Sequence, residues 1–339
     1  MTPTKLVQKT LVVAALLASA VLAGCGGPAE EASSAAGGGT KLSLVAYSTP
    51  KEAYEALIPA FQKSAAGKGV SFDQSYGASG DQSRAVAAGL PADIVAFSLA
   101  PDVDKLVEPG LVDANWTEAK NNGFVSNSVV VFAVRKGNPK NIKTWDDLIK
   151  PGVEVLTPNP FTSGGAKWNL MAAYGAQIKQ GKSPEEGLAY LEQLLTHTPV
   201  QDKSARESLQ TFAAGKGDVL ISYENEAITA QQKDVPLDYV VPDQTILIQN
   251  PAAVTKDAKP EAQKFLDWLH SDEAQKIYAS KGYRSVKESL IDKDKFPTPE
   301  TLFTIDDLGG WSKVNDEFFD TESGSVLEIE ENLGVSTAK

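Results

Sequence analysis

Cysteine and histidine are almost absent from this chain of 339 residues, and their scarcity excludes several kinds of chemistry. The single cysteine, Cys25, cannot form an intrachain disulfide, and a catalytic thiol is not expected. The two histidines, His197 and His270, stand in polar, helical stretches, and no motif marks either one as the base for a serine nucleophile. We therefore expect no Cys/His metal site, no cofactor and no enzymatic activity.

Basic residues are also few compared with acidic ones. The chain has 32 Lys and Arg against 44 Asp and Glu, which gives a formal charge of -12. A surface of that sign is repelled by nucleic acids and by acidic lipid. We expect no nucleic-acid partner. An anionic ligand would have to be held by local hydrogen-bond donors rather than by the field of the whole protein.

The apolar run at residues 11–21 is too short for a membrane span and ends in small residues, as secretory signals do. It is followed by Leu22-Ala23-Gly24-Cys25, which resembles a bacterial lipobox, in which the cysteine is acylated and becomes the new N-terminus. We predict that residues 1–24 are a signal peptide and that residues 25–40, rich in Gly, Ala and Ser, are a lipidated flexible tether. The expected location is extracytoplasmic (periplasmic or cell-surface), with lipidated Cys25 as the only membrane anchor.

From residue 41 the pattern alternates between apolar strands and amphipathic helices, as in a mostly parallel sheet with helices on both faces. The stretches predicted to form strands are 42–47, 70–75, 93–97, 128–134, 153–156 and 218–222. The predicted helices are 51–63, 81–88, 164 onward, 184–195, 204–214, 224 onward and 259–279. With crossings near 135–139 and 245–250, we predict lobe I from 41–134 plus 249–339 and lobe II from 135–248. The tail is expected to pack back on lobe I.

One stretch of the second lobe favours an anion site: Thr157-Pro158-Asn159-Pro160-Phe161-Thr162-Ser163-Gly164-Gly165-Ala166. Two prolines end the preceding strand, and the sequence becomes helical from Ala166. Ser163-Gly164-Gly165 then lies in the first helical turn, where N–H groups have no intrahelical partner and the helix dipole is positive. The glycines leave these groups uncovered, and the Ser163 hydroxyl is a further donor. The ordinary alternative is a helix start with a serine cap.

Similar turns follow expected strands or begin expected helices elsewhere in both lobes. They are Tyr47-Ser48-Thr49, Gly77-Ala78-Ser79-Gly80, Lys203-Ser204-Ala205-Arg206 and Ser222-Tyr223-Glu224-Asn225. Ligands of such folds gather at the carboxyl ends of the strands, where these turns lie. Many neutral donors that converge from two lobes would hold a small oxyanion without a buried cation. The alternative is an oxygen-ligand cation site built from Tyr47, Tyr223, Glu224 and Glu226.

With these residues in view, the chain resembles the periplasmic sulfate-binding proteins of bacterial sulfate/thiosulfate ABC importers. The resemblance runs from Leu42 to about Asn315 and rests on four blocks in order: Val134-Arg135-Lys136-Gly137-Asn138-Pro139-Lys140, Thr157-Pro158-Asn159-Pro160 with Ser163-Gly164-Gly165-Ala166, Tyr223-Glu224-Asn225-Glu226-Ala227, and Leu302-Phe303-Thr304-Ile305-Asp306 with Gly309-Gly310-Trp311. It implies an α/β, two-lobed periplasmic-binding-protein-like fold with a crossed-over hinge. Each lobe would be a mostly parallel sheet flanked by helices, and the ligand would lie in the inter-lobe cleft.

In that family the dianion is held by backbone N–H groups, serine hydroxyls and one indole N–H. Carried over, the resemblance implies these donors: the backbone of Ser48 or Thr49, the backbone and hydroxyl of Ser79, the hydroxyl of Ser163, and the backbone of Gly164, Gly165 and Ala205. Tyr223 stands at the position of the indole donor, and molybdate-binding relatives use a tyrosine donor in a comparable role. Asp81 stands where the family often has lysine, and it should weaken binding unless it faces solvent.

The resulting prediction is a monomeric, lipid-anchored receptor that binds sulfate, with thiosulfate as a further ligand, and delivers it to ABC permease subunits. Because Tyr223 replaces the indole donor, the alternative is a receptor of the same fold that binds molybdate or tungstate. A periplasmic sulfatase-like hydrolase and a scaffolding or adhesion protein are the other classes. The missing nucleophile motif counts against the first of these, and the donor-rich cleft counts against the second.

Overall fold

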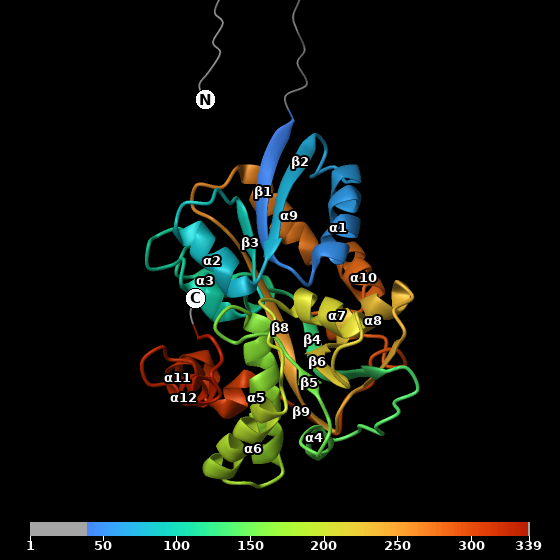
Figure 1. Ribbon diagram of the computed structural model, residues 1–339. Coiled ribbons are helices and arrows are strands. Elements are labelled where there is room, and N and C mark those ends of the chain that lie inside the picture. Colours follow the sequence, from blue (N-terminus) through green and yellow to red (C-terminus); the bar gives the residue numbers. More distant parts are fainter. Residues whose placement is uncertain (1–38, 338–339) are drawn as a thin grey trace, which may run out of the picture. The chain divides into compact units, whose positions relative to one another are not determined.

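The computed structural model describes residues 39–337, and in this part of the chain helices and strands alternate as expected (Figure 1). The predicted signal peptide, the tether up to residue 38 and the lipidation site Cys25 lie outside the described residues. The first elements are β1 (Thr40–Tyr47), α1 (Lys51–Lys63), β2 (Val70–Gly77), α2 (Ser79–Ala87), β3 (Ile94–Ala96), α3 (Ala100–Asp104) and the long strand β4 (Phe124–Arg135). Short 3-10 helices, Trp116–Glu118 and Lys120–Gly123, precede β4.

The second group of elements begins with the short helix α4 and ends with the long strand β8. They are α4 (Trp145–Leu148), β5 (Val155–Leu156), α5 (Gly164–Lys179), α6 (Pro184–Thr196), α7 (Ala205–Ala213), β6 (Val219–Tyr223), α8 (Glu224–Gln232), β7 (Leu237–Val240) and β8 (Gln244–Val254). The last elements are α9 (Pro260–Leu269), α10 (Asp272–Ser280), β9 (Thr301–Phe303), α11 (Gly310–Phe318) and α12 (Ser325–Asn332), with 3-10 turns at Glu288–Leu290 and Ile305–Leu308.

Two long strands, β4 and β8, connect the two halves of the sheet. The hydrogen-bonded order is β2-β1-β3-β8-β4-β6-β5, with β7 added beside β4 and β9 beside β8. The pairs β1–β2, β1–β3 and β5–β6 are parallel, as predicted. β4 pairs with β8 through its first half and with β6 and β7 through its second, and all three pairings are antiparallel. The two-lobed α/β class is confirmed, although the second half of the sheet is more antiparallel than expected, because the crossing strand β4 is built into it.

The apolar run in β4 is buried on both faces of the sheet. Val129, Val131 and Ala133 pack in the cluster that contains Phe212 of α7. The alternate residues Val130, Phe132 and Val134 pack in the cluster that contains Trp168 of α5. Since successive side chains of a strand point to opposite faces, an uninterrupted apolar run requires cover on both sides. The strand predicted at 128–134 is therefore confirmed, and it extends further in both directions.

Helix α1 covers β1 and β2 through one apolar stripe. Tyr54, Leu57, Ile58 and Phe61 are all buried and recur at the spacing of one helical face. The Phe61 ring lies 4.9 Å from that of Phe265 on α9, so α1 and α9 share a core. Figure 1 shows α1, α9 and α10 stacked beside β1 and β2.

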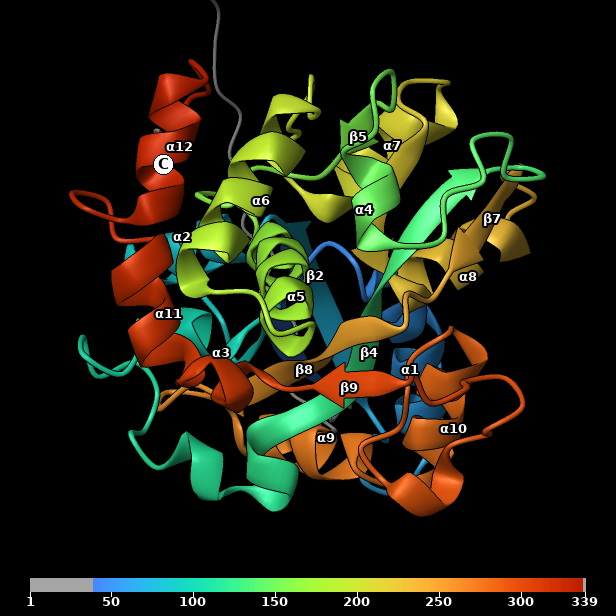
Figure 2. The same cartoon turned by 90° about the horizontal axis from the view of Figure 1, so that it is seen from below.

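The C-terminal tail divides between two places. Helices α9 and α10 pack in the core of the first half, as predicted. Helices α11 and α12 instead lie beside α5 and α6 (Figure 2). The ring centroids of Trp311 and Trp168 are 4.7 Å apart. Helix α11 also contacts α3 of the first half, so the tail does not pack on lobe I alone. The reason is that α5 is buried nearly all round and needs a cover on its outer side. The lobe boundaries at 135 and 249 stay a prediction.

Within residues 39–337, no helix is both long enough and apolar enough to span a bilayer.

Candidate functional site: a pocket of uncharged donors

Turns from both halves of the sheet meet at one small pocket. Ser48 and Thr49 follow β1, Ser79 opens α2, and Ser163 and Ser204 occupy the N-cap positions of α5 and α7. The ten residues that line the pocket are all uncharged: Tyr47, Ser48, Thr49, Ala78, Ser79, Ser98, Ser163, Gly165, Ser204 and Ala205. Six of the eight predicted ligand residues are among them. The other two, Gly164 and Tyr223, lie directly behind this lining.

Four helices begin at this pocket, which makes its walls electropositive without any cation. α1, α2, α5 and α7 start at Lys51, Ser79, Gly164 and Ala205, and the pocket residues precede or begin each of them. The first N–H groups of a helix have no intrahelical partner, and its dipole is positive at that end. Convergence of four such ends suits a small anion better than it suits a cation or an apolar ligand.

Gly164 and Gly165 have different reasons for being glycine. A Cβ on Gly164 would lie 2.6 Å from Leu99 Cδ2 and 2.8 Å from Ser98 Oγ, so only glycine lets α5 approach the β3–α3 turn. A Cβ on Gly165 would lie 3.4 Å from Ala205 Cβ and 3.4 Å from Ser163 Oγ, which are ordinary contacts. Gly165 lines the pocket, so a side chain there would enter the space for the ligand.

The two serine hydroxyls predicted as donors differ in their availability. Ser163 Oγ accepts a long bond of 3.4 Å from Ala166 N, which leaves its hydrogen free to donate. Ser79 Oγ donates to Asp102 Oδ2 at 2.6 Å and accepts from Ser98 N at 2.9 Å. The Ser79 hydrogen is therefore directed away from the pocket. Its backbone N–H, the first of α2, remains without an intrahelical partner.

Tyr223 ends β6 and is almost completely buried, with 1% of its surface exposed. Its hydroxyl lies 2.7 Å from Ser98 Oγ, and either oxygen can be the donor. Burial raises the pKa of Tyr223 far above its usual value, so the phenol keeps its proton. Ser98 lines the pocket but was not among the predicted residues. One sequence feature could have found it: Ser98 directly follows the stretch 93–97 predicted as a strand, just as Ser48 directly follows the stretch 42–47.

A half-buried cation next to the pocket residue Ala205, Arg206, is held mainly by carboxylates. It bonds Glu52 through two nitrogens, each at 2.6 Å, and Glu226 at 2.9 and 3.1 Å. Burial alone would raise the pKa of Glu52, but hydrogen bonds from Arg206 and Lys233 lower it to about 2. The positive charges of Arg206 and Lys233 thus balance the negative charges of Glu52 and Glu226. The cluster therefore adds little net charge beside the pocket.

Asp81 does not face the pocket. It pairs with Arg84, and its other oxygen lies 2.8 Å from Lys203 Nζ on the opposite side of the cleft. Nearby, Gly80 N donates to Thr162 O at 3.2 Å, so the α2 start touches the loop before α5. These contacts join elements of both halves above the pocket, as in a closed cleft.

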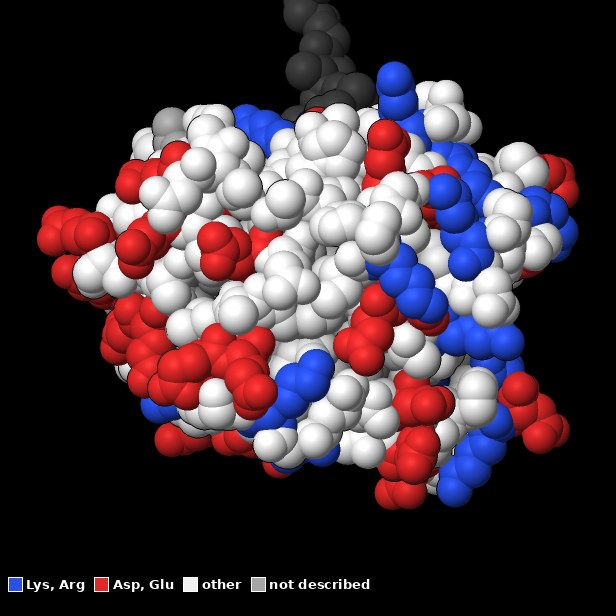
Figure 3. Space-filling view, turned by 60° about the horizontal axis from the view of Figure 1, so that its bottom comes forward, with Lys and Arg blue, Asp and Glu red and all other residues white. Residues whose placement is uncertain are grey.

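The surface has the acidic character that the composition predicts. Figure 3 shows acidic side chains gathered on the left of this face, the side that carries α11 and α12, and basic ones mainly on the right, mixed with further acidic ones. The exposed acidic residues of these helices and the turn between them are Asp316, Glu317, Glu322, Glu328 and Glu331. An anion is therefore attracted by the pocket itself and not by the field of this face.

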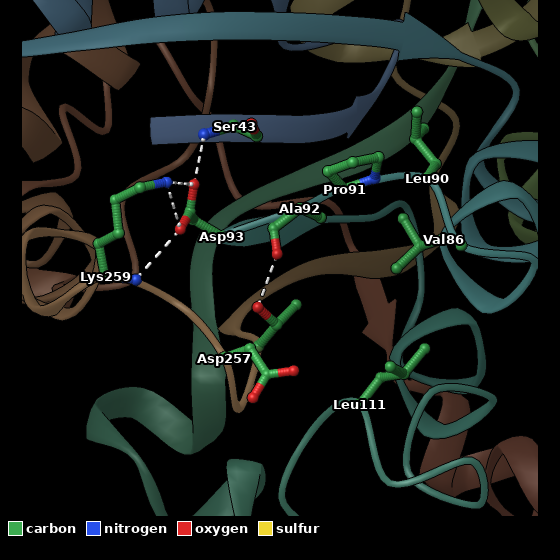
Figure 4. Close-up of a pocket in the computed structure, with 11 residues that line it drawn as sticks. Ser43, Val86, Leu90, Pro91, Ala92, Asp93, Leu111, Asp257 and Lys259 are labelled. Carbon is green, nitrogen blue, oxygen red and sulfur yellow. Dashed lines mark hydrogen bonds and ion pairs between the residues drawn. The ribbon is translucent and has the colours of Figure 1, made fainter. Parts of the chain in front are cut away.

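A separate pocket lies at the other end of the parallel strands (Figure 4). It is lined by Val86, Leu90, Leu111 and the carboxylates of Asp93 and Asp257. Asp93 accepts from Ser43 N at 2.7 Å and from Lys259 Nζ at 3.0 Å, so its oxygens already have donors. The carboxylates of Asp93 and Asp257 and the apolar side chains that line this pocket disfavour the binding of an anion.

The alternative sites suggested by the sequence are less well supported. Glu224 pairs with Arg284 at 2.7 Å and Glu226 pairs with Arg206, so neither carboxylate is directed to a cation site with Tyr47 and Tyr223. His197 Nδ1 meets the Val153 carbonyl at 2.9 Å. In the described part of the chain, no three His, Cys, Asp or Glu side chains gather as a metal site would require.

Comparison with known proteins agrees with this arrangement. The family model of bacterial extracellular solute-binding proteins matches residues 42–284. The chain is 40% identical to a sulfate-binding protein of Synechococcus elongatus over 328 residues, 92% of this chain and 94% of that one. It is 36% identical to a thiosulfate-binding protein of Escherichia coli over 307 residues, 85% of this chain and 90% of the relative.

Among solved structures, the sulfate-binding protein SubI from Mycobacterium tuberculosis superimposes with a TM-score of 0.81 at 45% identity, over 83% of this chain and 100% of SubI. Matches of this length extend through every turn that forms the pocket. The chain belongs to the family of bacterial extracellular solute-binding proteins.

Proposed function

We propose that this protein is an extracytoplasmic receptor that binds sulfate and delivers it to an ABC permease for import, without enzymatic activity of its own. The observation that carries the proposal is the pocket of ten uncharged residues at which four helices begin. A dianion is stabilised there by backbone N–H groups, hydroxyls and helix dipoles, with no buried counter-charge required. The names of the relatives support sulfate over molybdate or tungstate, and the thiosulfate-binding relative supports thiosulfate as a second ligand.

The proposed donors come from both halves of the cleft. They are the backbone of Ser48 or Thr49, of Ser79, of Gly164 and Gly165 and of Ala205, the Ser163 hydroxyl, and one hydroxyl of the Tyr223–Ser98 pair. Hydrogen bonds to a charged group contribute about 1.5–3 kcal/mol each, so losing one weakens binding measurably. Since the two sets face each other only when the cleft is closed, sulfate should stabilise the closed form.

We further propose that the receptor acts as a monomer and is held at the membrane by lipidated Cys25. The motif Leu22-Ala23-Gly24-Cys25 supports the anchor, and membership of an extracellular family supports an extracytoplasmic location. In a host with a lipoprotein pathway, Cys25→Ala should move the protein from the membrane fraction to the soluble fraction. Retention of this variant in the membrane would contradict the anchor.

The deciding experiment is calorimetry and thermal unfolding with sulfate, thiosulfate, molybdate and phosphate, with chloride as the control. Sulfate at a hundred times its dissociation constant should add about 2.7 kcal/mol of stability. Ser163→Ala should weaken sulfate binding, whereas Ser183→Ala removes a comparable N-cap from α6, outside the pocket, and should leave it unchanged. Tight molybdate binding without sulfate binding would overturn the proposal.

A further inference from the structure

Ser98 is the residue around which the two sides of the pocket are connected. Its N–H donates to Ser79 Oγ at 2.9 Å, and its carbonyl accepts from Trp168 Nε1 and Asn250 Nδ2, each at 2.9 Å. Its hydroxyl meets Tyr223 at 2.7 Å. These bonds connect the β3–α3 turn to α2, α5, β6 and β8. The Ser98 backbone is held by three of them, and its side chain is held by the bond to Tyr223.

Only one of the two paired hydroxyls belongs to the pocket. Ser98 is a lining residue, while Tyr223 stands behind it with its hydroxyl turned to Ser98. A pair of hydroxyls shares one hydrogen between its oxygens, and one hydrogen remains for a third group. A phenol is much more acidic than an aliphatic alcohol, so Tyr223 is the better donor and Ser98 the better acceptor. The remaining hydrogen is then that of Ser98.

From this geometry we propose that Ser98 is the residue whose hydroxyl donates to the bound oxyanion, and that Tyr223 is a positioning residue that acts through Ser98. Donation from Tyr223 orients the Ser98 hydroxyl toward the pocket and polarises it, which strengthens the bond to the anion. Gly164 contributes to this arrangement because it leaves room for the Ser98 hydroxyl: any Cβ at position 164 would collide with Ser98 Oγ. The inference rests on the proposed oxyanion-binding function and names the donor that stands in for the indole of similar proteins.

A double-mutant cycle with calorimetric sulfate titration tests the chain of donors. Ser98→Ala should raise the dissociation constant for sulfate about tenfold to a hundredfold, the loss of one hydrogen bond to a charged group. Tyr223→Phe should raise it no more than about fivefold, since the Ser98 hydrogen still reaches the anion. The double variant should bind like Ser98→Ala, because Tyr223 has no path to the ligand once Ser98 is gone.

Matched controls come from buried hydroxyls that are outside the pocket. Ser128→Ala and Tyr278→Phe remove such groups, and sulfate affinity should not change in either. If Ser98→Ala does not fold, Ser98→Cys decides the question instead, because the thiol keeps the volume and is only a weak donor.

Two results would overturn the inference while leaving the receptor function intact. One is wild-type affinity in Ser98→Ala together with a tenfold or larger loss in Tyr223→Phe, which would make Tyr223 the direct donor. The other is additive losses in the double variant, which would mean that the two hydroxyls act independently. Failure of the wild-type protein to bind sulfate would instead refute the proposed function.

Discussion

A buried carboxyl on the C-terminal helix should make the stability of this protein depend on pH near neutrality. Glu330 of α12 is 0% exposed and accepts one hydrogen bond, from Gln201 Nε2 at 2.8 Å. Its other oxygen and the Gln201 carbonyl oxygen are both buried without a partner. A neutral carboxyl would supply the missing hydrogen to this pair. Burial raises the pKa of Glu330 from 4.5 to about 7, and the Gln201 amide offsets only part of that increase.

The direction in which pH changes the free energy of unfolding follows from proton binding by Glu330. Between pH 4.5 and 7 the folded protein keeps the Glu330 proton that the unfolded chain has lost, so the free energy of unfolding falls as pH rises through this range. At 1.36 kcal/mol per pKa unit, the change is about 3 kcal/mol, complete only above pH 7. Glu330→Gln removes the ionisation and keeps a donor for Gln201. The stability advantage of the variant over wild type should therefore grow by about that amount from pH 5 to pH 8.

Urea unfolding of residues 26–339 at several pH values, followed by tryptophan fluorescence, measures this difference. Glu328→Gln, an exposed position on the same helix, is the control and should follow wild type at every pH. Parallel curves for wild type and Glu330→Gln would refute the argument. The effect bears on function because Gln201 is in the loop that leads to the start of α7 at the pocket.

Three further predictions concern the pocket and its closure. Gly165→Asp places a carboxylate in the pocket at a position with ordinary contacts, so calorimetry should show no sulfate binding while the melting temperature stays near wild type; intact binding would exclude the pocket. Arg206→Leu leaves buried Glu226 without its cation and Glu52 with Lys233 alone, and should cost about 3–5 kcal/mol in urea unfolding, partly recovered by adding Glu226→Leu; an unchanged midpoint would contradict this. Small-angle scattering should show a smaller radius of gyration with sulfate than without it, and equal radii would argue against lobe closure.

The sequence was most informative where one local pattern has one structural solution. The apolar run of β4 needed cover on both faces, and Ser163 with two glycines ahead of a helical pattern predicted the start of α5. These patterns depend on side-chain alternation and on helix ends, which are local properties. They were enough to predict the α/β class, whereas the six predicted ligand residues that line the pocket were implied by the family resemblance.

The features that the sequence did not reveal depend on contacts between distant residues. The bond between Ser98 and Tyr223 joins positions 125 residues apart, and that between Gln201 and Glu330 joins positions 129 apart. A lone serine or glutamate carries no periodic signal, so neither pair could be predicted. The same holds for α11 and α12, whose apolar stripes do not indicate the helices they pack against and whose place is set by contacts with distant residues of α5 and α6.

An acidic protein with an uncharged pocket must select its ligand by something other than opposite charge. Near neutral pH sulfate carries no proton, whereas phosphate keeps at least one, and that proton needs an acceptor in the pocket. The nearest buried carboxylate, Asp102, already accepts from Ser79 at 2.6 Å and from Lys105 at 3.0 Å. A protonated anion would leave a polar group unpaired in a closed cleft, and sites matched in this way reject the wrong analogue by roughly 10⁴-fold or more. We therefore expect excess phosphate to displace labelled sulfate poorly between pH 6 and 8, because the bond from Ser79 to Asp102 uses an acceptor that could otherwise take the proton of phosphate; effective displacement would contradict this reasoning.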